Sequence, residues 1–315
     1  MNLKEKRDWK KIFKNIGNIL VIISIIFLVR KITRLDINYK NYFSISNLLK
    51  LTPTLIIFTI LMIFQFFPWK MILFSMTKEN VSMLSMAKIF TKSSIMKYIP
   101  GNVFQYVGRI EIISENKKFN TSNVAVSVII ESLCLFCAAI IVGIVGARKY
   151  TLSVFKENKL LIFLVIGIFL VFFIIMCIYR KKIRAFLEKK NIKISMQLLT
   201  AICFSITFFA ITFIVQGLLL TDILSIFSSN NIFTASAIIC GAYSIGWVVG
   251  YITPGASGGI GIRETILCML LKNVTTDDII LVAVLVFRLV NILGDLLAFG
   301  IVQLTVKMVG QPRKS

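Results

Sequence analysis

Five ionisable residues lie inside long apolar runs of this sequence, where charged side chains are rare. They are Arg109, Glu131, Arg263, Arg288 and Asp295. A charge near the centre of a membrane helix costs about 2.5–3.5 kcal/mol on insertion scales, so these residues need partners or water. Arginine suits bidentate recognition of phosphate, and a nearby carboxylate can balance its charge or carry a coupling proton. The residues therefore predict an anion site or, alternatively, structural ion pairs. Arg288, Asn291 and Asp295 are spaced to share one helical face.

Two similar stretches interrupt the apolar runs, and each contains one of these arginines. The first is YIPGNVFQYVGRIE, from Tyr98 to Glu111, and the second is YITPGASGGIGIRE, from Tyr251 to Glu264. In both, a Tyr-Ile precedes a Pro-Gly, and an arginine follows the proline by nine residues. We interpret them as breaks in membrane helices.

Non-helical backbone inside a bilayer must be buried in protein or line a polar cavity, so we expect the two breaks to face each other. A helix that begins after a break would direct free N–H groups at an anion such as a phosphate. The alternative is that the prolines kink helices and the glycines pack against neighbouring helices. Glu111 and Glu264, which end the two stretches, are about equally well explained by structural ion pairing.

The composition is that of an integral membrane protein. The chain has 315 residues, of which 57% are hydrophobic and 16% charged, with a mean hydropathy of +0.86. Soluble domains usually contain about 25% charged residues. The net charge is +22, but lysine and arginine mostly flank the apolar runs, which favours anchoring to anionic lipid over nucleic-acid binding.

The residue types also limit the chemistry. Histidine is absent, which excludes Ser-His triads, histidine bases and histidine-ligated metals. The six cysteines, including the Cys134 and Cys137 pair, are interpreted as small hydrophobic residues. We therefore expect neither a metal nor another cofactor.

Charge distribution predicts how the apolar segments cross the membrane. If all eight segments cross fully, 14 basic residues lie inside and 17 outside. If the two Pro-Gly segments instead enter and leave on the same side, 19 lie inside and 10 outside, in agreement with the positive-inside rule. This second arrangement puts both termini in the cytoplasm. It also orients repeat one (about 16–147) oppositely to repeat two (about 159–309), and such inverted repeats are typical of transporters.

The predicted fold class is an all-α polytopic membrane protein, with one domain over residues 1–315. It has about six full transmembrane helices and two broken or re-entrant segments. The expected full spans are 16–29, 51–74, 124–146, 160–179, 196–220 and 279–308. Pro68 should kink the second of these, Trp69 should lie at a membrane interface, and Asn120 or Thr121 should cap the third. Three lysines before the first break are expected to line a wet cavity or reach its mouth: Lys88, Lys92 and Lys97.

The two broken segments resemble the signatures of a known family. KYIPGNVFQYVGR and PGASGGIGIRE are similar to motifs of the flippase-like, lysylphosphatidylglycerol-synthase transmembrane family. The resemblance covers nearly the whole chain and implies a bacterial or archaeal protein that moves aminoacylated phospholipids or lipid-linked glycans between leaflets. The chain ends at Ser315 without the soluble aminoacyl-transferase domain of the larger synthases, so we expect a stand-alone membrane region.

The leading prediction is a translocator of an anionic or phosphate-bearing lipid in the cell membrane. The alternative is an integral membrane transferase acting on a lipid phosphate in cell-envelope glycan or aminoacyl-lipid synthesis, and a third option is a channel or assembly scaffold. Expected partners are membrane lipids, with a second copy of the chain or envelope-synthesis enzymes as further candidates. The predicted substrate-binding residues are Pro100, Gly101, Arg109, Glu131, Pro254, Gly255, Gly258, Gly259, Arg263, Glu264, Arg288 and Asp295.

Overall fold

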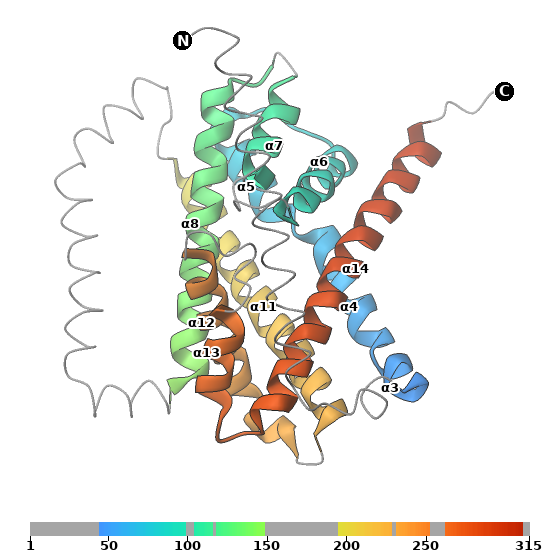
Figure 1. The fold of residues 1–315 in the computed structure, drawn as a ribbon. Helices are drawn as coiled ribbons and strands as arrows, with labels where there is room; N and C mark the ends of the chain where they lie inside the picture. The colour runs from blue at the N-terminus through green and yellow to red at the C-terminus, as the bar shows by residue number, and fades with distance from the viewer. Residues whose placement is uncertain are drawn as a thin grey trace, which may run out of the picture.

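The computed structural model describes residues 44–98, 104–115, 118–148, 195–228, 231–252 and 262–310, and within these ranges every regular element is a helix (Figure 1). The longer helices are α4 (Thr52–Phe64), α5 (Phe67–Thr77), α8 (Thr121–Gly146), α11 (Met196–Phe227), α12 (Ser236–Ile252) and α14 (Asp277–Gly310). The shorter ones are α3 (Ile45–Lys50), α6 (Met83–Ile95), η1 (Met96–Tyr98), α7 (Phe104–Ser114), η2 (Ile232–Ala235) and α13 (Ile262–Leu271).

Five segments of the described chain are long and apolar enough to cross a membrane. They are Ile45–Thr77, Thr121–Gly146, Met196–Phe227, Ile232–Tyr251 and Asp277–Val309. The prediction of a helical, multi-pass membrane protein is therefore confirmed. Four of the five coincide with predicted full spans, and the fifth is the first arm of the second predicted broken segment. The predicted spans at 16–29 and 160–179 lie outside the described residues.

Local sequence signals explain several helix ends. Asn120 caps α8, because its side chain accepts a hydrogen bond from the Ser122 N–H at 2.9 Å, and this prediction is confirmed. Pro68 stands in the first turn of α5, and the helix is interrupted between Phe64 and Phe67. Trp69 is fully buried among the described helices, and its indole N–H donates to the Ser127 hydroxyl on α8. Its predicted position at a membrane interface stays a prediction.

Two helical hairpins contain the predicted breaks. In the first hairpin, α6 and η1 lead to residues 99–103 and α7 returns against α6, with Gly108 packed on Met96 and Ser93. In the second hairpin, α12 leads to residues 253–261 and α13 returns against α12, with Gly246 close to Arg263 and Leu267. The first hairpin lies in the upper part of the molecule and the second in the lower part (Figure 1).

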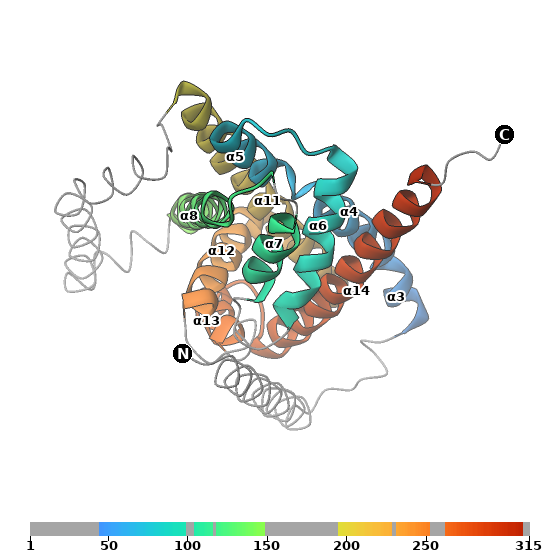
Figure 2. The same cartoon turned by 90° about the horizontal axis from the view of Figure 1, so that it is seen from above.

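The segment formed by α4 and α5 runs antiparallel to α11. The start of α4 meets the end of α11 through a 2.7 Å hydrogen bond from Thr54 to Asp222, and the end of α5 meets the start of α11 through Lys78 and Gln197. Viewed from above, α7 lies in the middle, with α8 and α12 on one side and α6 and α14 on the other (Figure 2). The second arm of the first hairpin thus lies inside the helix assembly, whereas α13 lies at its edge (Figure 2).

Close helix contact is concentrated where α8 and α12 cross. A Cβ added to Gly241 would lie 2.3 Å from the Ala147 backbone nitrogen, and one added to Gly146 would lie 2.5 Å from the Ala237 carbonyl oxygen. Gly217 on α11 has a similarly close contact with Cys240 on α12. Small residues allow this approach, as is usual between membrane helices.

The outward faces of the long helices are apolar, as expected for contact with lipid tails. Large exposed hydrophobic side chains occur on α4, α8, α11 and α14, including Ile57, Ile129, Ile211 and Leu293. The charged residues singled out from the sequence lie on inner faces instead. Arg109, Glu131, Glu264 and Asp295 are each at most 4% exposed.

Candidate functional site in the membrane interior

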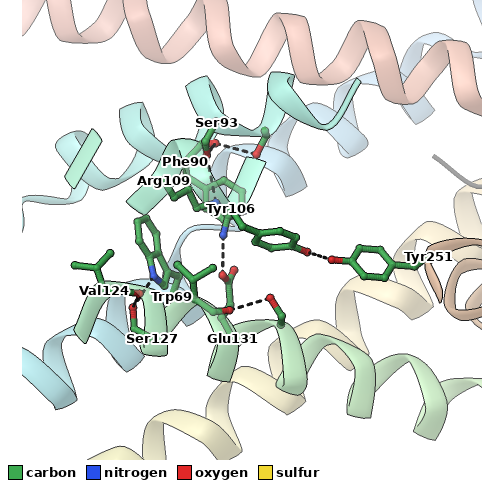
Figure 3. A network of polar contacts seen from close by, with 12 residues as sticks. Trp69, Phe90, Ser93, Tyr106, Arg109, Val124, Ser127, Glu131 and Tyr251 are labelled. Atoms are coloured by element: carbon green, nitrogen blue, oxygen red, sulfur yellow. Dashed lines mark hydrogen bonds and ion pairs between the residues drawn. The ribbon is translucent and has the colours of Figure 1, made fainter. Parts of the chain in front are cut away.

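Arg109 and Glu131 form a buried ion pair between α7 and α8. The Arg109 Nη1 atom lies 2.7 Å from Glu131 Oε2, and the two side chains are 5% and 6% exposed. The Arg109 Nε–H donates to the Ser93 hydroxyl on α6 at 3.2 Å (Figure 3). This pair balances its own charge and joins both arms of the first hairpin to α8.

Aromatic rings surround the Arg109 guanidinium. Its central carbon lies 4.0 Å from the ring centre of Phe90, 5.5 Å from that of Trp69 and 5.7 Å from that of Tyr106. Trp69 is itself held by a 3.1 Å hydrogen bond to Ser127 on α8. Cation–π contacts and the ion pair together fix the arginine in place.

A second ion pair joins α13 and α14 in the second half. The Arg288 Nη2 atom lies 2.8 Å from Glu264 Oε1, and the two side chains are 19% and 3% exposed. Arg263, the neighbour of Glu264, lies within electrostatic range of both Arg288 and Tyr243. Its Nε atom is buried and has no hydrogen-bond partner in the described part of the chain. We call Arg263, Glu264 and Arg288 the second-half cluster; it holds two cations and one carboxylate.

Asp295 on α14 contacts η1, the short helix that ends the first arm of the first hairpin. The Lys97 Nζ atom lies 2.6 Å from Asp295 Oδ2, and the Tyr98 hydroxyl donates to the same oxygen. Within the described ranges, Asp295 Oδ1 and Asn291 Oδ1 are buried without a hydrogen-bond partner. Arg288 and Asp295 on one face of α14 therefore bind residues from two different hairpins.

The two hairpins touch each other through a pair of tyrosines. The Tyr251 hydroxyl donates to the Tyr106 hydroxyl at 2.8 Å (Figure 3). Tyr251 stands just before the second break, and Tyr106 stands just after the first. The Tyr251 ring also stacks on Trp247 and meets the edge of Phe136 on α8. The breaks themselves lie outside the described residues, so the expectation that they face each other stays a prediction.

The predicted site residues divide into two groups. Pro100, Gly101, Pro254, Gly255, Gly258 and Gly259 lie outside the described residues. The six others are described, and they form three connections: Arg109 with Glu131, Arg288 with Glu264 beside Arg263, and Asp295 with Lys97.

Several residues that contact the buried charges were not predicted from the sequence. Ser93, Tyr106, Trp69 and Tyr98 contact the buried charges, although Tyr98 and Tyr106 stand within the first repeated stretch, which was the available signal. Of the three lysines before the first break, Lys97 reaches Asp295, whereas Lys88 and Lys92 are exposed on α6.

No protein-family model, curated protein or solved structure matches this chain. The resemblance of the two repeated stretches to a lipid-translocating family therefore stays a prediction.

Proposed function

We propose that this chain is a lipid translocator that moves an anionic or phosphate-bearing lipid between membrane leaflets. The observation that carries the proposal is the second-half cluster, where two arginines share one carboxylate inside an apolar helix assembly. A buried positive charge in a membrane protein is costly and marks a functional site by default. A lipid phosphate would bind between these arginines while its acyl chains stay in the bilayer.

The arrangement of the hairpins supports an inverted repeat. In each half, the helix after the break forms an ion pair with the next long helix: α7 with α8, and α13 with α14. Across the halves, η1 contacts α14 through Lys97, and α12 contacts α8 through Tyr251 and Phe136. Transporters with such repeats bind substrate where broken helices from the two halves meet.

The proposal is tested by reconstituting the purified protein in liposomes and measuring leaflet exchange of fluorescent phosphatidylglycerol. Arg263→Ala should slow the exchange, because a hydrogen bond to a charged group contributes about 1.5–3 kcal/mol, or roughly a ten- to hundredfold change in affinity. The matched control is Arg148→Ala, which removes an exposed arginine beyond the end of α8 and should leave the rate unchanged. Equal rates for Arg263→Ala and the unmodified protein, across a panel of anionic lipids, would contradict the proposal.

The same liposomes distinguish translocation from the transferase alternative. Lipids extracted after incubation should be chemically unchanged, because the proposed reaction breaks and forms no covalent bond. A new lipid species that depends on Glu131, Glu264 or Asp295 would favour the transferase instead.

A further inference from the structure

We infer that Asp295 and Asn291 on α14 form a binding site for a small monovalent cation such as Na⁺, and that the Lys97 ammonium competes for this site. The inference concerns an inorganic ion and does not depend on the proposed lipid translocation. It is carried by two buried oxygen atoms that have no hydrogen-bond partner in the described ranges, and by a lysine that places one positive charge beside the same carboxylate.

The two oxygen atoms lie on one face of α14. Asn291 and Asp295 stand at positions i and i+4, so their side chains lie about one helical turn apart. Asp295 is 3% exposed. Its Oδ1 atom and the Asn291 Oδ1 atom are both buried, and neither accepts a hydrogen bond from the part of the chain that the structure describes. Buried acceptors without a partner are costly and rare in native proteins, so these two oxygens call for a ligand.

The chemistry of these oxygens suits a small, hard cation. Carboxylate and side-chain carbonyl oxygens are the ligands that such ions prefer, and one carboxylate with a neutral oxygen matches a single positive charge. The absence of histidine speaks against a transition metal but not against an ion held by oxygen. Arg288 shares this face of α14, but its guanidinium lies 2.8 Å from Glu264 on α13.

Lys97 marks the place of the cation and competes with it. The Lys97 Nζ atom lies 2.6 Å from Asp295 Oδ2, and the Tyr98 hydroxyl donates to the same oxygen. The Lys97 side chain is 29% exposed, so its ammonium is not enclosed and can leave the carboxylate. Exchange of this ammonium for Na⁺ replaces one monovalent cation by another beside Asp295. The occupant of the site therefore determines whether Lys97 holds η1 against α14.

The direct test measures binding of radioactive Na⁺ to the purified protein in detergent, with choline chloride keeping the ionic strength constant. Binding should be saturable and should be displaced by unlabelled Na⁺. Asp295→Asn should abolish binding because it removes the negative charge, and Asn291→Leu should weaken it because it removes a neutral oxygen. The matched control is Asp222→Asn, which changes a carboxylate that accepts a 2.7 Å hydrogen bond from Thr54 and should leave Na⁺ binding unchanged.

A change at the competing lysine gives a readout that a purely structural role of Asp295 would not move. Lys97→Gln removes the ammonium and should strengthen Na⁺ binding by at least about tenfold, because a carboxylate that is mostly occupied is available to the ion for only a fraction of the time. Lys92→Gln is the matched control. Lys92 is exposed on α6, so its loss should not change the affinity for Na⁺.

The unmodified protein provides a second measurement, which decides the matter if the α14 variants do not fold. Acylation of lysines, quantified by mass spectrometry, should modify Lys97 faster in sodium chloride than in choline chloride, because Na⁺ displaces its ammonium from Asp295. Lys92 is the internal reference and should react at the same rate in both salts.

The outcomes separate this inference from the proposed function. Saturable Na⁺ binding that falls in Asp295→Asn and rises in Lys97→Gln supports the cation site. The inference is overturned by folded, unmodified protein that does not bind Na⁺, by binding that neither variant alters, or by equal Lys97 acylation in both salts. Na⁺ binding without leaflet exchange would contradict only the proposed function, and leaflet exchange without Na⁺ binding would contradict only the cation site.

Discussion

The two arginines that follow the breaks have different surroundings, although their positions in the repeated stretches match. Arg109 is enclosed by Glu131, Ser93 and three aromatic rings. Arg263 shares its carboxylate neighbour with Arg288, and its Nε atom lacks a hydrogen-bond partner among the described residues. The contacts of the first arginine hold the first hairpin against α8, and we propose that the second arginine receives the anion.

Removing one member of the Arg109 and Glu131 pair should therefore destabilise the protein. Glu131→Leu leaves a buried guanidinium without its carboxylate, and breaking a buried pair in this way costs about 3–5 kcal/mol. The double variant Arg109→Met with Glu131→Leu should recover most of this loss, because an apolar pair leaves no uncompensated charge. Thermal unfolding in detergent, followed by tryptophan fluorescence, measures both effects.

Exposed residues provide the control for that comparison. Glu111→Gln and Arg148→Met change exposed charges and should shift the unfolding temperature little. A double variant as unstable as Glu131→Leu alone would show that Arg109 does more than pair with Glu131.

The sequence predicted the buried charges better than it predicted their partners. Helical spacing placed Arg288 and Asp295 on one face, and both indeed reach the two hairpins. Their partners could not be inferred, because Tyr98 and Asp295 are 197 positions apart and spacing carries no information over that distance. The buried partner of the Trp69 indole N–H could not be predicted either, because Ser127 lies 58 positions further along the chain.

At the scale of helices, glycines set how closely α8 and α12 approach. The Cβ positions of Gly146 and Gly241 would overlap backbone atoms of the facing helix, and a backbone cannot move aside as a flexible side chain can. Gly300 on α14 differs, because a Cβ there meets nothing within 4 Å. Gly146 and Gly241 should therefore tolerate a larger side chain much less well than Gly300 does.

Substitution by valine should reveal this difference. Gly241→Val should lower the free energy of unfolding by about 1–3 kcal/mol or prevent assembly, as overpacking does in tightly packed cores. Gly300→Val makes the same chemical change in a helix with free space and should cost much less. The measurements are the yield of folded protein by size-exclusion chromatography and the unfolding temperature. Equal losses of yield and stability in both variants would contradict the prediction that Gly241 is the more tightly packed glycine.

Helix positions were largely predictable, but whether a helix crosses the membrane completely was not. Apolar runs and the Asn120 cap located α8 to within a few residues. The Pro-Gly stretches correctly separated α6 from α7 and α12 from α13. The segment formed by η2 and α12 is long enough to span a membrane, although it leads into a predicted break. Apolar composition cannot distinguish a complete crossing from the first arm of a hairpin.

At the scale of the whole molecule, the hairpins lie toward opposite ends and touch through Tyr106 and Tyr251 (Figure 1). The contacts between helix ends agree with the topology that the charge count favoured. Thr54 and Asp222 lie together at one end, and Lys78 and Gln197 lie together at the other.

The topology has a direct test in cysteine labelling. In a variant without the six native cysteines, Thr121→Cys at the start of α8 should face the cytoplasm and Asn273→Cys after α13 the outside. A membrane-impermeant maleimide should then label Asn273→Cys in spheroplasts but label Thr121→Cys only after permeabilisation. Arg148→Cys is the reference for the outer side. Labelling of residues 121 and 273 from the same side would contradict the opposed hairpins.

The contact of Asp295 with Lys97 and Tyr98 also constrains how the protein is made. Tyr98 precedes Asp295 by 197 residues, and synthesis proceeds at about 5–20 residues per second, so roughly ten to forty seconds separate them. During that time Lys97 must stay in water or at the lipid surface, because its partner has not yet been synthesised. Insertion of α14 is thus the step at which the first hairpin can settle, so the final helix completes the assembly of the first half.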